Sequence, residues 1–268
     1  MTTNQLGIVN PDELHESHEQ FAEAWSLYAR NSGQGDVFDM NGLRIANASL
    51  PWYLSNAAVL SAPMSSKEEL AACVEGAIQY FKSEQHPWFF VGGRQWLGED
   101  ASATLSQLGL TELFTVTGMV SEQLTTPTRP VTNVVTRRIE DEEARLALAD
   151  LNALAYNVSN EWVRQAASGE SLWNTPLYGY NAYVDEQPVA TAFAVPLNGV
   201  IYVAYAATAL AHRRKGLAEL VMRRSIEHAM RDTGITRSVL HATADGCSMY
   251  IKMGYRPVEE FVIYTQQA

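Results

Sequence analysis

One stretch near the C-terminus restricts the fold more than any other, because residues 200–231 combine three successive patterns. Residues 200–205, Val-Ile-Tyr-Val-Ala-Tyr, are β-branched and aromatic and follow Asn198-Gly199, which favours a strand entered from a hairpin. Behind a short basic turn, apolar residues from Ala218 to Ala229 recur at helical spacing, with arginines on the opposite side. The sequence therefore predicts a strand, a turn and an amphipathic helix in direct succession.

The turn itself reads Arg-Arg-Lys-Gly-Leu-Ala over residues 213–218. A helix that opens at Gly216 presents free backbone N–H groups and the positive end of its dipole, which together suit a pyrophosphate. Gly216 and Ala218 leave room for phosphate oxygens to approach the main chain, while the basic residues supply charge. The alternative is an ordinary solvated helix start. Six of the 14 basic residues after position 125 lie between 213 and 231, which favours an anionic ligand.

A second block follows over residues 238–256, where an apolar strand, a small-residue turn and a short helix end at Gly254. With both blocks in this order, the chain resembles the GNAT superfamily of N-acetyltransferases. Arg213-x-x-Gly216-x-Ala218 is similar to the family's acyl-CoA pyrophosphate signature, and Tyr250-x-x-x-Gly254-Tyr255 is similar to its Tyr-x-x-x-Gly-aromatic signature. The two signatures together are far more specific than either alone.

The resemblance implies a site for acetyl-CoA as co-substrate, without a metal. In the family, the strand before the signature splays from its neighbour, and its freed main-chain groups bind the pantetheine arm. The residues that the resemblance assigns to the cofactor are Ala206, Ala207 and Thr208 for pantetheine and Arg213, Arg214, Lys215, Gly216, Leu217 and Ala218 for the pyrophosphate.

Tyr250 is the general acid that the resemblance implies, protonating the CoA thiolate after an amine has attacked the thioester directly. A phenol suits this role, since its pKa of roughly 10 is close to the roughly 8.5 of a thiol. The alternative for Tyr250 is a packed tyrosine on a short helix. Cys247 as a nucleophile is rejected, because no His–carboxylate arrangement is legible around it.

The general base has several candidates. His241 on the strand before Tyr250 and Glu161 on a predicted helix are two of them, and Asp245 in the turn is a third. Each has a simpler interpretation, as a packed histidine, a solvated helix residue or a turn-former. Tyr202 and Tyr205 are candidates for a proton relay through water. No base is needed if the amine arrives neutral.

The composition agrees with a soluble enzyme, and we expect it in the cytoplasm. The chain has 268 residues, of which 47% are hydrophobic, so it can bury one large core or two ordinary ones. Its two cysteines, Cys73 and Cys247, have neither zinc-like spacing nor a disulfide pattern, which favours a reducing compartment. No run of 18 apolar residues occurs and residues 1–5 do not read as a signal segment, so no membrane association is expected.

The net charge of −11 is unevenly distributed. Residues 1–125 hold 15 acidic and five basic residues, whereas residues 126–268 hold 15 acidic and 14 basic ones. An acidic first half argues against nucleic-acid binding, and the basic cluster of the second half is too short and lacks interleaved aromatics. The acidic surface favours a cationic, amine-bearing acceptor.

The boundary between the halves is predicted at a polar connector with two prolines, residues 121–130. We therefore expect a degenerate GNAT-like domain over 1–125 and a catalytic GNAT domain over 126–268. In the second half the patterns predict a strand at 131–138, helices at 140–155 and 157–167, and strands at 178–184 and 188–195, ahead of the elements described above. The expected fold class is α/β (α+β), with a mixed central sheet flanked by helices.

The first half carries a faint echo of the second. Leu105-x-x-x-Gly109-Leu110 has the spacing of Tyr250-x-x-x-Gly254-Tyr255, and a plausible last strand follows each, at 114–119 and 260–265. Before the echo, Ser65 or Ser66 caps a predicted helix that runs through Phe81, and 87–91 reads as a buried strand. This half resembles the inert half of tandem GNAT proteins, which keeps the architecture and loses the cofactor site. An unrelated α/β cap is the alternative.

The sequence thus predicts an acetyl-CoA-dependent N-acetyltransferase that acts on a small-molecule amine, as a monomer or homodimer. A non-catalytic acyl-CoA-binding protein is the alternative function. A nucleotide-binding P-loop is set aside, since Gly-x-x-x-x-Gly-Lys-Ser/Thr is missing. We also expect an aromatic acceptor pocket, lined by Trp162, Trp173, Tyr178, Tyr180 and Tyr183.

Overall fold

The computed structural model describes residues 10–127 and 130–266, which form two compact units. Residues 1–5, which do not read as a signal segment, and Thr128 and Arg129 of the connector lie outside the described residues. The first unit holds the described residues up to Met119, together with 241–247 and 256–266. The second unit holds the described residues of 120–240, together with 248–255.

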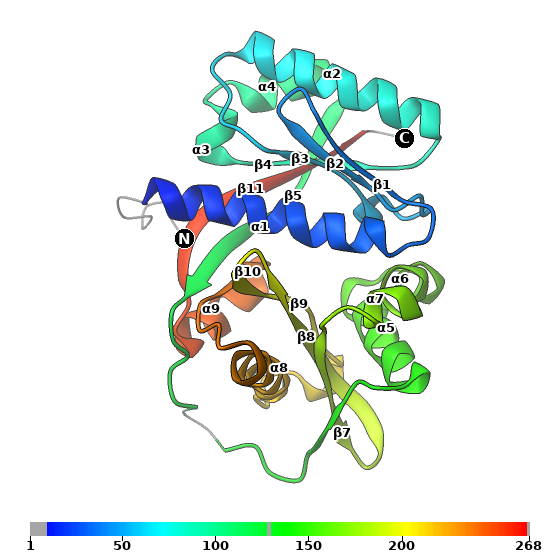
Figure 1. Ribbon diagram of the computed structural model, residues 1–268, viewed down its shortest axis with the longest axis vertical. Helices are drawn as coiled ribbons and strands as arrows, with labels where there is room; N and C mark the ends of the chain where they lie inside the picture. The colour runs from blue at the N-terminus through cyan, green and yellow to red at the C-terminus, as the bar shows by residue number, and fades with distance from the viewer. Residues whose placement is uncertain (1–9, 128–129, 267–268) are drawn as a thin grey trace. The chain divides into compact units, whose positions relative to one another are not determined.

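The first unit is a mixed sheet with helices on both faces (Figure 1). Its strands lie in the order β1-β2-β3-β4-β11-β5, in which β3 and β4 are parallel and β1–β2, β2–β3 and β4–β11 are antiparallel. Its elements are α1 (Pro11–Arg30), β1 (Asp36–Met40), β2 (Leu43–Asn47), η1 (Tyr53–Ser55), β3 (Asn56–Leu60), α2 (Lys67–Glu84), β4 (Phe89–Gly93), α3 (Arg94–Leu97), α4 (Ala101–Gln107), β5 (Leu110–Ser121) and β11 (Arg256–Gln266).

Two apolar clusters, one on each face of this sheet, form the core of the first unit. Phe21 of α1 packs with Ala46, Val59 and Phe261 on one face. Helices α2, α3 and α4 cover the other face, where Phe81 stacks on Trp88 with 4.8 Å between ring centroids. The alternation of buried side chains along each strand supplies both clusters, as expected for a sheet covered on both sides.

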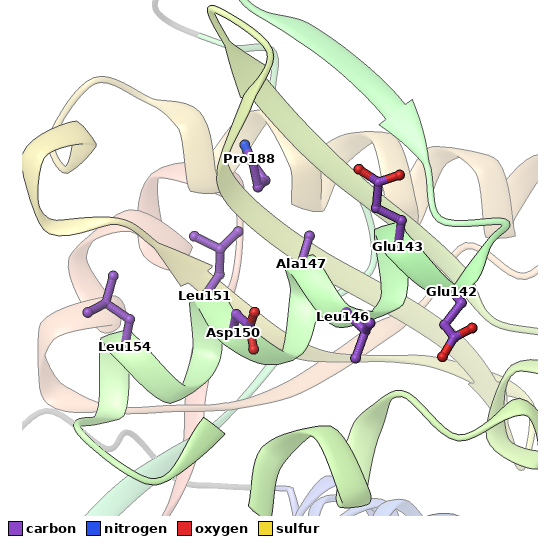
Figure 2. A pocket seen from close by; sticks show the side chains of 8 residues that line it. All are labelled: Glu142, Glu143, Leu146, Ala147, Asp150, Leu151, Leu154 and Pro188. Atoms are coloured by element: carbon purple, nitrogen blue, oxygen red, sulfur yellow. The ribbon is translucent and has the colours of Figure 1, made fainter. Parts of the chain in front are cut away.

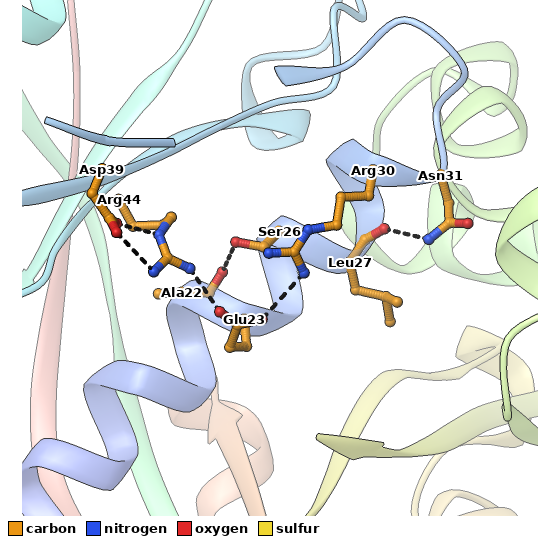
Figure 3. A network of polar contacts seen from close by, with 8 residues as sticks. All are labelled: Ala22, Glu23, Ser26, Leu27, Arg30, Asn31, Asp39 and Arg44. Atoms are coloured by element: carbon orange, nitrogen blue, oxygen red, sulfur yellow. Dashed lines mark hydrogen bonds and ion pairs between the residues drawn. The ribbon is translucent and has the colours of Figure 1, made fainter. Parts of the chain in front are cut away.

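Ion pairs also join α1 to the β1–β2 hairpin (Figure 3). The Arg44 guanidinium donates to a Glu23 carboxylate oxygen at 2.6 Å and also pairs with Asp39. Hydrogen bonds from Arg44 to these carboxylates raise its pKa, with that to Asp39 contributing most. Arg30 contacts the second oxygen of Glu23 at 3.3 Å.

The second unit is also a mixed sheet between helices, with strands in the order β10-β9-β8-β7-β6. Strands β9 and β10 are parallel, and the remaining neighbours are antiparallel. Helix α8 covers one face, and α5, α6 and α7 lie on the other (Figure 1). Its elements are β6 (Val135–Arg138), α5 (Glu142–Tyr156), α6 (Asn160–Ala167), α7 (Glu170–Trp173), β7 (Tyr178–Val184), β8 (Gln187–Leu197), β9 (Val200–Thr208), η2 (Leu210–His212), α8 (Leu217–Thr233), β10 (Ser238–Ala242) and α9 (Ala244–Met253).

The expected mixed α/β fold is confirmed, and most predicted elements occur within a few residues of the ranges given by the sequence. The compact units differ from the linear division at residue 125, however. Strand β11 comes from the C-terminal end of the chain yet pairs with β4 of the first unit, in register Phe261↔Gly93 to Thr265↔Phe89. A local pattern predicts a strand but does not specify its partner, so the sequence could not place β11 in this sheet.

Within the described residues, none of the helices combines the length and apolar character needed to cross a membrane.

Candidate functional site

The N-terminus of α8 lies at the end of a sharply turned loop. Arg214 (φ 62°) and Gly216 (φ 81°) both adopt left-handed backbone conformations, and Gly216 is the N-cap residue. The first helical bond runs from Leu220 N–H to the Gly216 carbonyl at 3.0 Å. Because glycine brings no side-chain oxygen, the N–H groups of the first turn are not capped by it, and they can donate to an anion.

The side chains around this helix start have the charge and exposure that an anion requires. Arg213, Arg214 and Lys215 are all exposed, whereas Leu217 is buried beneath them. Arg213 donates through Nε to the Thr208 carbonyl at 3.3 Å. The Thr208 hydroxyl is buried and has no hydrogen-bond partner among the described residues. The Thr208 hydroxyl and the uncapped start of α8 thus each leave hydrogen-bond donors that a ligand can use.

Glycine at position 216 has a second physical reason. A Cβ there would lie 3.2 Å from Val131 Cγ2, and its positive φ is unfavourable for other residues. Substitution would therefore distort the turn on which the N–H groups depend.

Strands β9 and β10 are paired over only part of their length. The parallel register covers Ile201 to Val203 on β9 and Ser238 to Leu240 on β10. Beyond Val203, β9 continues to Thr208 with its other edge bonded to β8. Residues 206–208, to which the resemblance assigns the pantetheine arm, lie in this continuation. Their role is not tested by the geometry and stays a prediction.

The Tyr250-x-x-x-Gly254-Tyr255 signature has a structural explanation in the end of α9. Tyr255 N–H donates to the Tyr250 carbonyl at 3.0 Å and Gly254 N–H to the Ile251 carbonyl at 3.1 Å, the two bonds of a Schellman motif. Gly254 has φ 101°, and a Cβ there would lie 2.8 Å from the Gln123 carbonyl oxygen. The rings of Tyr250 and Tyr255 meet edge to face at 6.0 Å, and Tyr250 is 9% exposed. The glycine therefore terminates the helix and fixes where Tyr250 lies.

His241, a candidate base, belongs to the first unit. Its ring packs against Phe21 and Phe261 at centroid distances of 4.6 and 4.8 Å, and Nε2 lies 3.4 Å from Ser17 Oγ. Burial lowers the pKa of His241 to about 3. A group with so low a pKa is neutral at pH 7 but a weak proton acceptor, so these surroundings favour a packing role.

The other candidates have different surroundings. Glu161 is exposed on α6, and Asp245 is exposed in the first turn of α9. Tyr202 is buried in β9, and burial raises the pKa of both Tyr202 and Tyr205. No general base is identified by these positions, and His241 and Glu161 stay predictions.

The aromatic residues expected to line one acceptor pocket are divided between the two faces of the sheet. Tyr178 and Tyr180 contact His228 on α8, at ring distances of 4.9 and 5.9 Å. Trp173 instead packs against Phe193, at 6.1 Å. The expectation of a single pocket was wrong, because Tyr178 and Tyr180 face α8 whereas Trp173 lies on α7 at the other face of the sheet (Figure 1), so crowding in sequence does not bring these side chains together.

A groove of about 550 Å³ runs along α5 beside the start of β8 (Figure 2). It includes none of the residues that the sequence assigns to the cofactor or to catalysis. Its lining consists of Glu142, Glu143, Leu146, Ala147, Asp150, Leu151, Leu154 and Pro188. The Asp150 carboxylate is already engaged by Arg164, with two contacts of 2.7 Å.

Two features of the second unit were not predicted from the sequence. One is a bulge in β9 at Tyr205, and the other is the buried side chain of Asn152, which contacts it. An asparagine on the apolar side of a predicted helix is the one signal that the sequence offers for it.

Comparisons with known proteins agree with this geometry. Residues 144–255 match the acetyltransferase (GNAT) family. No curated protein matches the chain. Among solved structures, a GCN5-related N-acetyltransferase from Kribbella flavida is 19% identical and has a TM-score of 0.71, with 98% of this chain and 97% of that one covered.

Two further solved structures have the same fold over nearly the whole chain. A GCN5-related N-acetyltransferase from Sphaerobacter thermophilus is 10% identical, with a TM-score of 0.57 and coverage of 94% of this chain and 93% of that one. A tandem GNAT protein from the clavulanic acid biosynthesis pathway is 13% identical, with a TM-score of 0.56 and coverage of 96% and 95%. GNAT acetyltransferases use acetyl-CoA as co-substrate, and the residues at the start of α8 fit its pyrophosphate. The match to the acetyltransferase (GNAT) family thus spans residues 144–255, and the chain as a whole has the fold of a tandem GNAT protein.

Proposed function

We propose that this protein is an acetyl-CoA-dependent N-acetyltransferase that moves an acetyl group directly from CoA to the amine of a small molecule. The observation that carries the proposal is the uncapped start of α8, with Gly216 in a left-handed conformation and three exposed basic residues before it. This arrangement suits a diphosphate bound by main-chain N–H groups without a metal. The family match over 144–255 supports the same cofactor.

In the proposed reaction, the amine nitrogen attacks the thioester carbonyl carbon, a C–N bond forms and the C–S bond breaks. The Tyr250 hydroxyl gives its proton to the departing sulfur, and the amine loses a proton to water. Tyr250 lies on α9, whose end is fixed by the Schellman motif at Gly254, so its ring is held in one place. Holding the acid in place is what makes proton transfer effective.

The first 125 residues form, in this proposal, a degenerate GNAT-like domain, and residues 126–268 carry the chemistry. Support comes from repeated topology within the two units. In the first, antiparallel β1-β2-β3 leads through α2 to β4, parallel to β3. In the second, antiparallel β7-β8-β9 leads through α8 to β10, parallel to β9.

We place the enzyme in the cytoplasm, where Cys73 and Cys247, both free thiols, stay reduced. A monomer or homodimer fits the tandem arrangement, and the proposed acceptor is a cationic amine, since the net charge is −11. A non-catalytic acyl-CoA-binding protein is the second candidate, favoured by the lack of an identified base.

The test has two arms. Calorimetry measures acetyl-CoA binding by the full chain and by Gly216→Trp, with Gly199→Trp as control, because Gly199 also has a positive φ but lies in the β8–β9 hairpin with open space around it. We expect the unchanged chain and Gly199→Trp to bind acetyl-CoA and Gly216→Trp not to bind it. Release of free thiol is then followed with a panel of amines. Absence of acetyl-CoA binding would sink the proposal, and binding without turnover of any amine would leave the non-catalytic alternative.

A further inference from the structure

Strand β9 contains a bulge close to the proposed pantetheine-binding segment. On the β8 side, Phe193 faces Ala204 and Thr191 faces Ala207, so Tyr205 and Ala206 share a single opposite residue. Tyr205 has φ 53°, a left-handed conformation that is strained for a tyrosine. A bulge of this kind bends the strand and changes the direction of the residues that follow it.

A buried asparagine on α5 contacts this bulge. Asn152 is 3% exposed, and its Nδ2 donates to the Tyr205 carbonyl at 3.1 Å and to the Leu148 carbonyl at 2.9 Å. Both amide hydrogens are therefore used, one within the helix and one on the bulge. The Tyr205 ring stacks on Phe193, with centroids 5.3 Å apart.

These contacts compensate the strain at one residue. A bulge interrupts the regular ladder, and a hydrogen-bond partner from outside the ladder for the Tyr205 carbonyl stabilises the chain there. The Asn152 amide supplies that partner from a helix packed on β9. Without it, a regular β8–β9 register would become more favourable, and Ala206, Ala207 and Thr208 would each shift relative to β8.

We propose that Asn152 is a positioning residue for the acyl donor: it holds the bulge at Tyr205 and thereby directs the main chain of 206–208 toward the pantetheine arm. The inference rests on the proposed function. It predicts that loss of Asn152 weakens binding of the pantetheine part of CoA but not of the diphosphate part, because Asn152 acts on the strand and not on the start of α8.

The experiment compares binding of CoA with binding of 3′-phosphoadenosine 5′-diphosphate, which has the diphosphate but no pantetheine. Asn152→Ala should weaken CoA binding about tenfold and change binding of the adenine nucleotide by less than about twofold, since the buried hydrogen bond to the bulge is lost and the start of α8 is left unchanged. Asn152→Ser is the second variant. Its hydroxyl can still bond the Leu148 carbonyl but is too short for Tyr205, so the same division is expected.

Asn31→Ala is the matched control, because Asn31 Nδ2 makes the same helical bond to the carbonyl four residues before it, Leu27, at 2.8 Å. It should change neither affinity. In a Tyr205→Gly background the positive φ is no longer strained, so Asn152→Ala should weaken CoA binding by less than about threefold.

Two results would overturn the inference: equal weakening of both ligands, or unchanged CoA binding by both Asn152 variants. A wild-type chain that binds neither ligand would instead remove the proposed function, and this inference with it.

Discussion

Helices α2 and α8 occupy equivalent places in the two units, each following the third strand of an antiparallel meander, yet their first turns differ in chemistry. At α2 the chain caps itself: Ser66 Oγ accepts from Glu69 N–H at 3.1 Å, and Glu69 Oε2 accepts from Ser65 N–H at 2.8 Å. At α8 the cap is Gly216, which has no side chain. The start of α2 thus has the carboxylate of Glu69, whereas the start of α8 has no capping side chain and can bind a phosphate.

The loops before the two helices extend the contrast. Residues 61–66 contain no Arg or Lys, and Met64 N–H donates to the Trp96 carbonyl at 2.9 Å. At the ends of β3 and β4, a Cβ on Gly92 would lie within 3.1 Å of both Leu60 and Leu97, so side chains fill this space. The first unit therefore shares the topology of the second, while its own main chain and side chains occupy the groups and the space at these positions.

The ends of α4 and α9 can be compared in the same way. Gly109 N–H donates to the Ser106 carbonyl at 3.0 Å, just as Gly254 N–H donates to that of Ile251. Both glycines have positive φ. The position of Tyr250 is taken in the first unit by Leu105, which is fully buried. The glycine therefore ends the helix in both units, but only the second unit has a tyrosine hydroxyl at the position of Tyr250.

The largest expected effect comes from placing a carboxylate at the start of α8, where α2 has that of Glu69. Gly216→Asp places a carboxylate at the start of the helix and repels the diphosphate. We expect acetyl-CoA binding to weaken at least about a thousandfold, because two charged hydrogen bonds or more are lost. Calorimetry measures this. Gly199→Asp, with the same positive φ in a hairpin, should bind normally, and equal loss in both variants would contradict the assignment.

The second largest effect is expected from removing the Tyr250 hydroxyl, which α9 has and α4 lacks. Tyr250→Phe should lower kcat about three hundredfold while acetyl-CoA affinity stays within about twofold, since general acid catalysis is lost and the ring is kept. Initial-rate kinetics of thiol release give both values. Tyr255→Phe, which loses only the 2.8 Å contact with Ser238 Oγ, should retain kcat. Undiminished turnover by Tyr250→Phe would mean that another group protonates the thiolate.

A buried histidine of the first unit should make the protein less stable in acid. His18 is 1% exposed, its Nε2 accepts from Gly93 N–H at 3.1 Å, and burial lowers its pKa to about 4. Since the folded pKa lies below the unfolded value of 6.5, the unfolded chain binds more protons between these limits. Stability should therefore fall as pH drops from 6.5 to about 4, by about 3 kcal/mol from His18.

Urea unfolding between pH 7 and pH 4 measures this loss, and His18→Gln should reduce its dependence on pH. His241 adds to it in the same direction, because its pKa is lowered to about 3. An unchanged pH dependence in the variant would contradict the role of His18.

The smallest effect is expected from removing the cap of α2. Ser66→Ala should destabilise the protein by about 1 kcal/mol, as an N-cap loss does, and leave acetyl-CoA affinity unchanged. Urea unfolding and calorimetry give the two values. A gain of a second acetyl-CoA site would show that the self-capped turn is more than a structural feature.

The site was predicted from sequence to the extent that it depends on local patterns. Helical periodicity, the glycine at 216 and the basic run before it predicted the start of α8, and the Tyr250–Gly254 spacing predicted the end of α9. The bulge at Tyr205 was not predicted, because the residues Tyr-Ala-Ala at 205–207 give no indication of a positive φ. Its partner Asn152 is also 53 residues away in the sequence. The prediction of one aromatic pocket was wrong, because residues close in sequence lie on a strand that faces α8 and on α7, which covers the other face of the sheet (Figure 1).

The sequence by itself determined the strand–turn–helix segments, their caps and the family that residues 144–255 match, because these depend on neighbouring residues and on backbone conformations that few residue types allow. Only the tertiary structure decided that β11 pairs with β4 of the first unit, that His241 packs among phenylalanines and that Asn152 holds Tyr205. These are contacts between distant segments, selected by burial and by the pairing of buried polar groups, and no local pattern encodes them.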